Sequence, residues 1–173
     1  MLTSDLHLCI VYLSTLIPMA LHPGDSAPTF TLFNSDKQEV SLADYRGKNL
    51  LILFFPMAFT SVCTAELCAV RDALSDYNQL NADVVGISVD SPFTLAKFKE
   101  EQRLNFPLLS DFNKEVSTAY GALYDNFVLG MKGVSKRAAF VVDGEGRIQY
   151  TEVLENAGEQ PNFENIQQAL GKS

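Results

Sequence analysis

The chain has 173 residues, of which 47% are hydrophobic and 20% are charged, and its formal net charge is −8. This length predicts one domain that buries a core of its own. The acidic balance disfavours nucleic acids and anionic membrane surfaces as partners, because both require basic patches. Three cysteines are too few for a disulfide framework.

The first twenty residues differ in composition from the rest of the chain. Residues 6–21 are apolar at all but four positions, yet this stretch is too short and too interrupted for a transmembrane helix. It also lacks the positive start of a secretory signal. We therefore separate an N-terminal extension, residues 1–20, from a domain over residues 21–173. The extension is read as upstream sequence ahead of Met19, as a signal or anchor, or as a structural helix, and its Cys9 is assigned no chemistry.

Short strands and turns follow in the first part of the domain. Residues 29–33 and 39–41 are predicted strands joined by a polar turn, which makes an N-terminal β-hairpin. Residues 41–45 are typical of one helical turn, ended by Gly47. Residues 50–55 form a nearly continuous apolar run, which favours a strand that is covered on both faces.

A long helix is predicted next, over residues 62–81. Leu67, Val70, Leu74 and Tyr77 recur at steps of three and four residues and form one apolar stripe. A further helix is predicted to start at Ser91-Pro92, where serine suits the N-cap and proline the first helical position.

Strands and helices continue to alternate to the end of the chain. In the second helix, which runs to about Arg103, we expect Phe93, Ala96 and Phe98 to be partly buried. The remaining predicted elements are strands at 83–89, 106–110, 138–142 and 148–154, helices at 113–120 and 162–170, and a hairpin turn at 143–146. This order predicts an α/β domain with a central mixed β-sheet flanked by helices, in which the last hairpin adds an antiparallel edge.

One loop carries the candidate chemistry. The predicted strand at 50–55 ends at Pro56, and the loop then delivers Thr60 and Cys63 to the start of the predicted helix, with the spacing P-x3-T-x2-C. Sites in such sheets gather beyond the carboxyl ends of strands. A thiol at a helix N-terminus has its thiolate favoured by unpaired backbone N–H groups and the helix dipole. Cys63 is therefore the candidate nucleophile.

The run from Phe54 to Asp72 resembles the active site of the peroxiredoxins, a family of thiol peroxidases on a thioredoxin-like fold. The resemblance extends over residues 21–170 and includes the segments 90–92, 106–111 and 137–143. It implies an enzyme that reduces hydrogen peroxide or organic hydroperoxides without a metal, flavin or haem. It also implies a thioredoxin-like or other dithiol reductant, a cytoplasmic location, and a monomer or homodimer.

The resemblance gives each candidate residue a role that physical chemistry supports. A thiolate on Cys63 attacks one peroxide oxygen, and fixed donors must meet the charge on the departing one. Thr60 either donates to the thiolate or orients the peroxide, and Arg137 matches the active-site arginine of the family. Pro56 is expected to shield the sulfur from water. Glu66, one helical turn past Cys63, is expected to hold the arginine in place.

Cys68 leaves two routes open for the sulfenic acid that peroxide forms on Cys63. The five-residue spacing resembles the bacterioferritin-comigratory, or PrxQ-type, branch, which implies that Cys68 resolves it in an intramolecular disulfide. The sequence of residues 54–60 resembles the one-cysteine alkyl hydroperoxide reductase E branch, which implies that an external thiol reduces the sulfenic acid. On a helix, residues five apart are roughly 8–9 Å apart at Cα, whereas a disulfide tolerates about 7 Å. A Cys63–Cys68 disulfide therefore requires the first helical turns to unwind.

Two other functions are open to such a chain. A thioredoxin-like disulfide oxidoreductase has C-x-x-C at this helix start, whereas Cys63 and Cys68 have the spacing C-x4-C. A copper or zinc chaperone would need a third ligand beside the two cysteines, but both histidines, His7 and His22, precede the predicted core. A Val-Cys-Pro segment near the C-terminus, which resolution by a partner chain would use, does not occur in the sequence.

Overall fold

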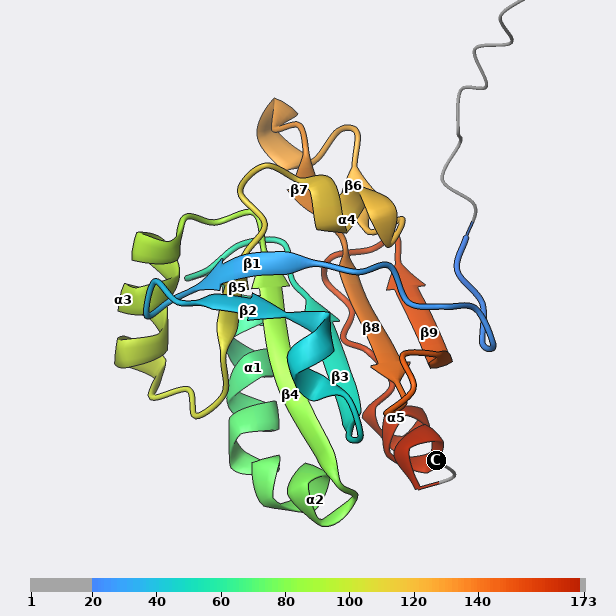
Figure 1. Ribbon diagram of the computed structural model, residues 1–173. Helices are drawn as coiled ribbons and strands as arrows, with labels where there is room; N and C mark the ends of the chain where they lie inside the picture. The colour runs from blue at the N-terminus through green and yellow to red at the C-terminus, as the bar shows by residue number, and fades with distance from the viewer. Residues whose placement is uncertain (1–19, 172–173) are drawn as a thin grey trace, which may run out of the picture.

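The centre of the molecule is a seven-stranded sheet with the strand order β2-β1-β5-β4-β3-β8-β9 (Figure 1). It is seen in a computed structural model, which describes residues 20–171. β3, β4 and β5 run parallel, and the remaining pairs are antiparallel, so the sheet is mixed as predicted. Its strands are β1 (Thr31–Asn34), β2 (Glu39–Ser41), β3 (Asn49–Phe54), β4 (Ala82–Ser88), β5 (Leu108–Ser110), β8 (Arg137–Val142) and β9 (Ile148–Leu154).

Two apolar clusters, one on each face of the sheet, form the core. Alternate residues of a strand point to opposite faces, so Leu51 packs with Leu67 on one face while Ile52 packs with Val116 on the other. This explains the continuous apolar run of β3, whose six residues are all buried. The helices are η1 (Leu42–Tyr45), α1 (Ser61–Asp72), α2 (Leu74–Gln79), α3 (Pro92–Gln102), α4 (Glu115–Ala119), η2 (Val128–Gly130) and α5 (Phe163–Leu170).

The helix predicted over residues 62–81 is two helices, so that prediction was wrong. Ala73, with φ −96° and ψ 8°, separates α1 from α2. The side chain of Asn105 donates to the backbone carbonyl of Arg71 at 3.2 Å, which gives one of the last carbonyls of α1 a partner outside the helix. The change of direction at Ala73 lets α2 pack against β4.

α3 begins where the sequence predicted, but one of its aromatic residues lies elsewhere than expected. Ser91 caps the helix by accepting a backbone N–H of the first turn, and Pro92 is the first helical residue. Phe98 is buried, whereas Phe93 is 69% exposed, which corrects the expectation of burial. Phe93 lies in the first turn, beyond the sheet, where its ring contacts the ammonium group of Lys37 at 5.3 Å.

The segment between α4 and β8 has structure that the sequence did not predict. β6 (Leu123–Tyr124) and β7 (Val134–Ser135) form a small second sheet, and η2 lies between them. In Figure 1 this segment lies at the top of the view, above the seven-stranded sheet. The predicted N-terminal extension, including Cys9, lies outside the described residues except for Ala20. Within residues 20–171 no helix has both the length and the apolar character needed to span a bilayer.

Candidate active site

The mixed sheet brings Cys63 and Arg137 together at the end of two neighbouring strands, β3 and β8. β3 ends at Phe54, and the loop that follows leads into α1, where Cys63 lies in the first turn. β8 runs antiparallel to β3 and pairs Ala138 with Phe54, so Arg137 starts β8 where β3 ends. The 74 residues between the thiol and the guanidinium are thus bridged by one strand pairing.

Arg137 is buried and donates hydrogen bonds to three neighbours, Cys63, Glu66 and Ala157. Its side chain is 1% exposed. One terminal nitrogen, Nη2, donates to Cys63 Sγ at 3.3 Å and to the backbone carbonyl of Ala157 at 2.9 Å. Nε also donates to that carbonyl, and Nη1 donates to the carboxylate of Glu66. The guanidinium is therefore held in a fixed orientation in which Nη2 points toward the sulfur of Cys63.

The partner of the arginine, Glu66, is 0% exposed. Burial raises the pKa of Glu66 to about 7, although Arg137 acts in the opposite direction. Burial lowers the pKa of Arg137, but Glu66 and Cys63 raise it, and the net shift is upward. The second carboxylate oxygen, Oε1, is buried and has no hydrogen-bond partner among residues 20–171. The expected contact between Glu66 and the arginine is present, and it places an ionisable pair directly behind the thiol.

A pocket of about 430 Å³ opens onto the sulfur, and four of the five predicted site residues line it: Pro56, Thr60, Cys63 and Arg137. Thr60 precedes α1 and is exposed. Its hydroxyl donates to the carbonyl of Met57 at 2.9 Å. Because that bond uses the hydroxyl hydrogen, the lone pairs of Thr60 Oγ1 remain to accept a hydrogen bond from a molecule in the pocket.

The loop between β3 and α1 is tied to the neighbouring strand and helix. The N–H of Ala58 donates to Asp90 Oδ2 at 2.8 Å, just beyond the end of β4. Phe59 has φ 63°, a left-handed conformation that is uncommon for an aromatic residue. Its ring lies edge-on to Phe98 of α3 at 5.1 Å between centroids. These contacts hold the turn that places Thr60 and Cys63.

Cys68, the fifth predicted site residue, lies outside this pocket. It is on α1 with Cys63, but it faces the C-terminal end of α3. Its Sγ is 3.8 Å from Gln102 Oε1 and 3.6 Å from Arg71 Nη1. Both Cys63 and Cys68 are free thiols in the structure. α1 is continuous between the two cysteines, so a disulfide between them would require part of this helix to unwind.

Sequence reasoning missed the opposite wall of the pocket and the backbone acceptor of the arginine. The wall comes from the segment around η2, with Phe127, Val128, Leu129 and Met131 among the lining residues. Leu129 is 96% exposed, although it is apolar. An apolar run in a glycine-containing loop was a usable signal for a binding wall. The carbonyl of Ala157 had no sequence signal, because every residue has a backbone carbonyl.

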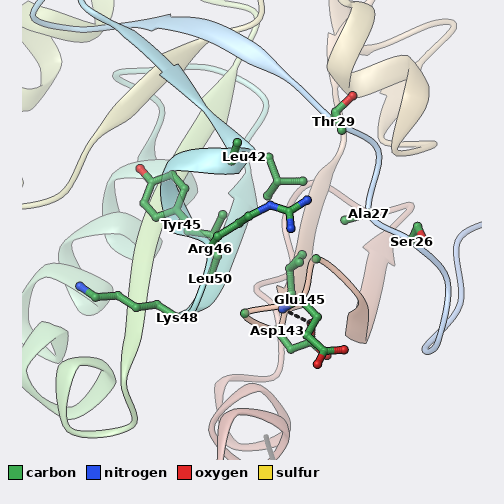
Figure 2. Close-up of a pocket in the computed structure, with 14 residues that line it drawn as sticks. Ser26, Ala27, Thr29, Leu42, Tyr45, Arg46, Lys48, Leu50, Asp143 and Glu145 are labelled. Carbon is green, nitrogen blue, oxygen red and sulfur yellow. Dashed lines mark hydrogen bonds between the residues drawn. The ribbon is translucent and has the colours of Figure 1, made fainter.

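A second pocket lies at the opposite edge of the sheet, where β3 begins and β8 ends (Figure 2). Arg46 and Lys48 line it together with Asp143 and Glu145. Asp143 accepts the N–H of Glu145 at 2.9 Å, which closes the turn between β8 and β9. Neither of the two cysteines that the structure describes, Cys63 and Cys68, lines this pocket. Within residues 20–171, no group of three or more His, Cys, Asp or Glu side chains is arranged to hold a metal ion.

Comparison of the sequence with known proteins gives one family. The AhpC/TSA family matches residues 23–151. A putative peroxiredoxin of Mycobacterium tuberculosis is 48% identical over 130 residues, which cover 74% of this chain and 82% of the relative. Peroxiredoxin Bcp of Escherichia coli is 36% identical over 132 residues, which cover 75% of this chain and 84% of the relative.

Solved structures agree with the sequence comparison. Peroxidoxin BcpB from Mycobacterium tuberculosis superposes with a TM-score of 0.76 and 28% identity, over 87% of this chain and 96% of that one. A peroxiredoxin-like protein from Aquifex aeolicus superposes with a TM-score of 0.79 and 27% identity, over 88% of each chain. These neighbours confirm the predicted thioredoxin-like fold with its central mixed sheet.

Proposed function

The chain belongs to the AhpC/TSA family, with Bcp-type peroxiredoxins among its relatives, and on this premise we propose that it reduces hydroperoxides through a sulfenic acid on Cys63. The family is one of thiol peroxidases, and the observation that carries the residue assignment is the 3.3 Å contact between Arg137 Nη2 and Cys63 Sγ at the base of an open pocket. A fixed cation beside a thiol favours the thiolate, which is the nucleophile.

In the first step the Cys63 thiolate attacks one oxygen of the peroxide. An S–O bond forms and the O–O bond breaks. The departing oxygen leaves as hydroxide or alkoxide and takes up a proton, which gives water or an alcohol. Arg137 and the unpaired N–H groups at the start of α1 stabilise the negative charge as it moves from sulfur to the departing oxygen.

Two further residues shape the step. Thr60 Oγ1 accepts the hydrogen bond of the peroxide O–H, since its own hydrogen is given to Met57. This arrangement orients the attacked oxygen toward Cys63. Pro56 is buried and lines the pocket beside the sulfur, where it excludes water and strengthens the local electrostatics.

Cys68 then resolves the sulfenic acid by forming an intramolecular disulfide with Cys63. The packing of α1 supports unwinding from its N-terminal end. Among residues 61–65 only Cys63 is buried, whereas the next turn buries Glu66, Leu67 and Val70. The first turn therefore loses little apolar contact when it unwinds. A dithiol protein of the thioredoxin type is the proposed reductant of the disulfide, because disulfides are reduced by thiolate exchange.

Peptide mapping under non-reducing conditions tests this function. The protein is treated with one equivalent of hydrogen peroxide, trapped with dimedone, and mapped by mass spectrometry. We expect a Cys63–Cys68 disulfide in the wild type and a dimedone adduct on Cys63 in the Cys68→Ser variant. A Cys9→Ser variant is the matched control and should behave as the wild type.

Two results would contradict parts of the proposal. A wild-type protein that carries only the dimedone adduct has a one-cysteine cycle with an external thiol, and Cys68 is then not the resolving residue. A Cys63→Ser variant that still consumes peroxide at the wild-type rate removes Cys63 from the nucleophile position.

A further inference from the structure

We propose that Arg71 keeps Cys68 ready as a thiolate and so sets the rate at which the sulfenic acid is resolved. The proposal rests on the function above, in which Cys68 is the resolving residue. Arg71 lies three residues after Cys68 on α1, which puts both side chains on the same side of the helix. Its Nη1 donates to Cys68 Sγ at 3.6 Å.

The guanidinium of Arg71 is held in place by contacts on both sides. Nη1 also donates to the backbone carbonyl of Gln102 at the end of α3, at 2.6 Å, and Nε donates to the neighbouring Asp72 at 2.8 Å. The arginine is thus held next to the sulfur, with the carboxylate of Asp72 as its ion-pair partner on the side of Nε.

Cys68 needs such a cation because its position on α1 does not itself stabilise a thiolate. Cys63 lies at the helix N-terminus, where the dipole favours an anion, but Cys68 lies in the C-terminal half, where the dipole opposes one. Cys68 also packs against the apolar core cluster, and burial disfavours a thiolate. Arginine stays charged at all physiological pH values.

The surroundings of Cys68 accommodate both protonation states of the sulfur. As a thiol, Cys68 donates to Gln102 Oε1 at 3.8 Å. As a thiolate, it accepts from Arg71 Nη1. Because Arg71 belongs to the same helix, the pair stays together while the first turn of α1 unwinds to bring Cys63 nearer.

The resolving step balances without a further reactant. The Cys68 thiolate attacks the sulfur of the Cys63 sulfenic acid, the S–S bond forms and the S–O bond breaks. The oxygen leaves as hydroxide and takes a proton to become water. Cys68 sulfur is oxidised and Cys63 sulfur is reduced by the same electron pair. Arg71 acts on the protonation state of the attacking sulfur, so its loss should matter most at low pH.

Two measurements on Arg71→Gln and Arg71→Lys test the proposal. In a background with Cys9→Ser and Cys63→Ser, Cys68 is the sole thiol, and its alkylation by iodoacetamide is followed as a function of pH. In a background with Cys9→Ser alone, rapid quenching after one equivalent of hydrogen peroxide follows the sulfenic acid and the Cys63–Cys68 disulfide separately. Arg46→Gln is the matched control, because it removes the same charge at the opposite edge of the sheet (Figure 2).

We expect Arg71→Gln to slow both alkylation and disulfide formation about 5-fold near neutral pH, the effect of losing one partly exposed charge contact. The difference should disappear at high pH, and sulfenic acid formation should be unchanged. Arg71→Lys should keep most of the wild-type rate. The proposal is overturned if Arg71→Gln forms the disulfide at the wild-type rate, or if Arg71→Lys is as slow as Arg71→Gln. A wild type that forms no disulfide overturns intramolecular resolution itself, and this inference with it.

Discussion

The two halves of α1 place two thiols in different surroundings. Cys63, in the first turn, is buried and receives its cation from Arg137, which lies 74 residues away on β8. Cys68, in the second half, is partly exposed and receives its cation from Arg71, three residues along the same helix. The first pair depends on the pairing of β3 with β8, whereas the second lies within one turn of α1.

This difference suits the proposed catalytic cycle, in which Cys63 has to move toward Cys68. The Cys63–Arg137 contact is broken when the first turn of α1 unwinds, because the cation stays on the sheet. The Cys68–Arg71 contact survives, because the two residues lie three apart in the second half of the helix, beyond the turn that unwinds. On the proposed mechanism, Cys63 therefore reacts with peroxide only in the folded helix, while Cys68 keeps its cation in both forms.

The largest expected effect comes from removing the long-range cation. Arg137→Gln should slow sulfenic acid formation by about 10²–10³-fold, the usual effect of losing one fixed donor to a developing charge. Cys68 alkylation should not change, since Arg71 remains. Stopped-flow mixing with hydrogen peroxide measures the first quantity.

Arg137→Lys is the companion variant, because it keeps a cation opposite Glu66 and so guards against a loss of folding. It should be faster than Arg137→Gln but slower than the wild type, since lysine lacks the guanidinium fork. A change of less than about 5-fold in both variants would mean that the distant cation adds little to the helix N-terminus, and the contrast between the two thiols would fail.

The second effect is a pH dependence of stability that comes from Glu66, on the Cys63 side. Burial raises the pKa of Glu66 from 4.5 to about 7. The folded protein therefore holds this proton more tightly than the unfolded chain. The stabilisation is fully present below about pH 4.5 and is lost as the pH rises to about 7.

Glu66→Gln should remove that loss. Urea unfolding at low and neutral pH should show the wild type losing about 1–3 kcal/mol more of its free energy of unfolding than the variant over this interval. Glu145→Gln is the control, because Glu145 is exposed and far from the thiols. Parallel pH curves for the wild type and Glu66→Gln would show that the carboxylate does not titrate in this range.

The sequence predicted the local parts of the fold and site and missed the parts that depend on tertiary contact. The apolar run of β3 and the cap of α3 are local signals, and the structure confirms both predictions. The break at Ala73 was missed because Leu74 and Tyr77 continue the helical stripe across it. Nothing in the local pattern shows that Asn105 meets the end of α1.

The same division applies to the candidate site. The spacing of Pro56, Thr60 and Cys63 lies within one loop and one helix start, so the sequence places them together. Arg137 could be assigned only through a family resemblance, since its approach to Cys63 results from the pairing of β3 with β8. The carbonyl of Ala157, which fixes the arginine, has no sequence signature at all.

The smallest of these three effects concerns the hydroxyl at the start of α1, which the Cys68 half lacks. Thr60→Val should slow sulfenic acid formation about 10-fold, because the peroxide O–H loses its acceptor. Thr60→Ser should restore the rate, since it keeps the oxygen. Thr64→Val, one turn further and outside the pocket lining, is the matched control. If Thr60→Val reacts at the wild-type rate, the oxygen of Thr60 is not what the peroxide requires, and the two thiols then differ only in their cations and helix position.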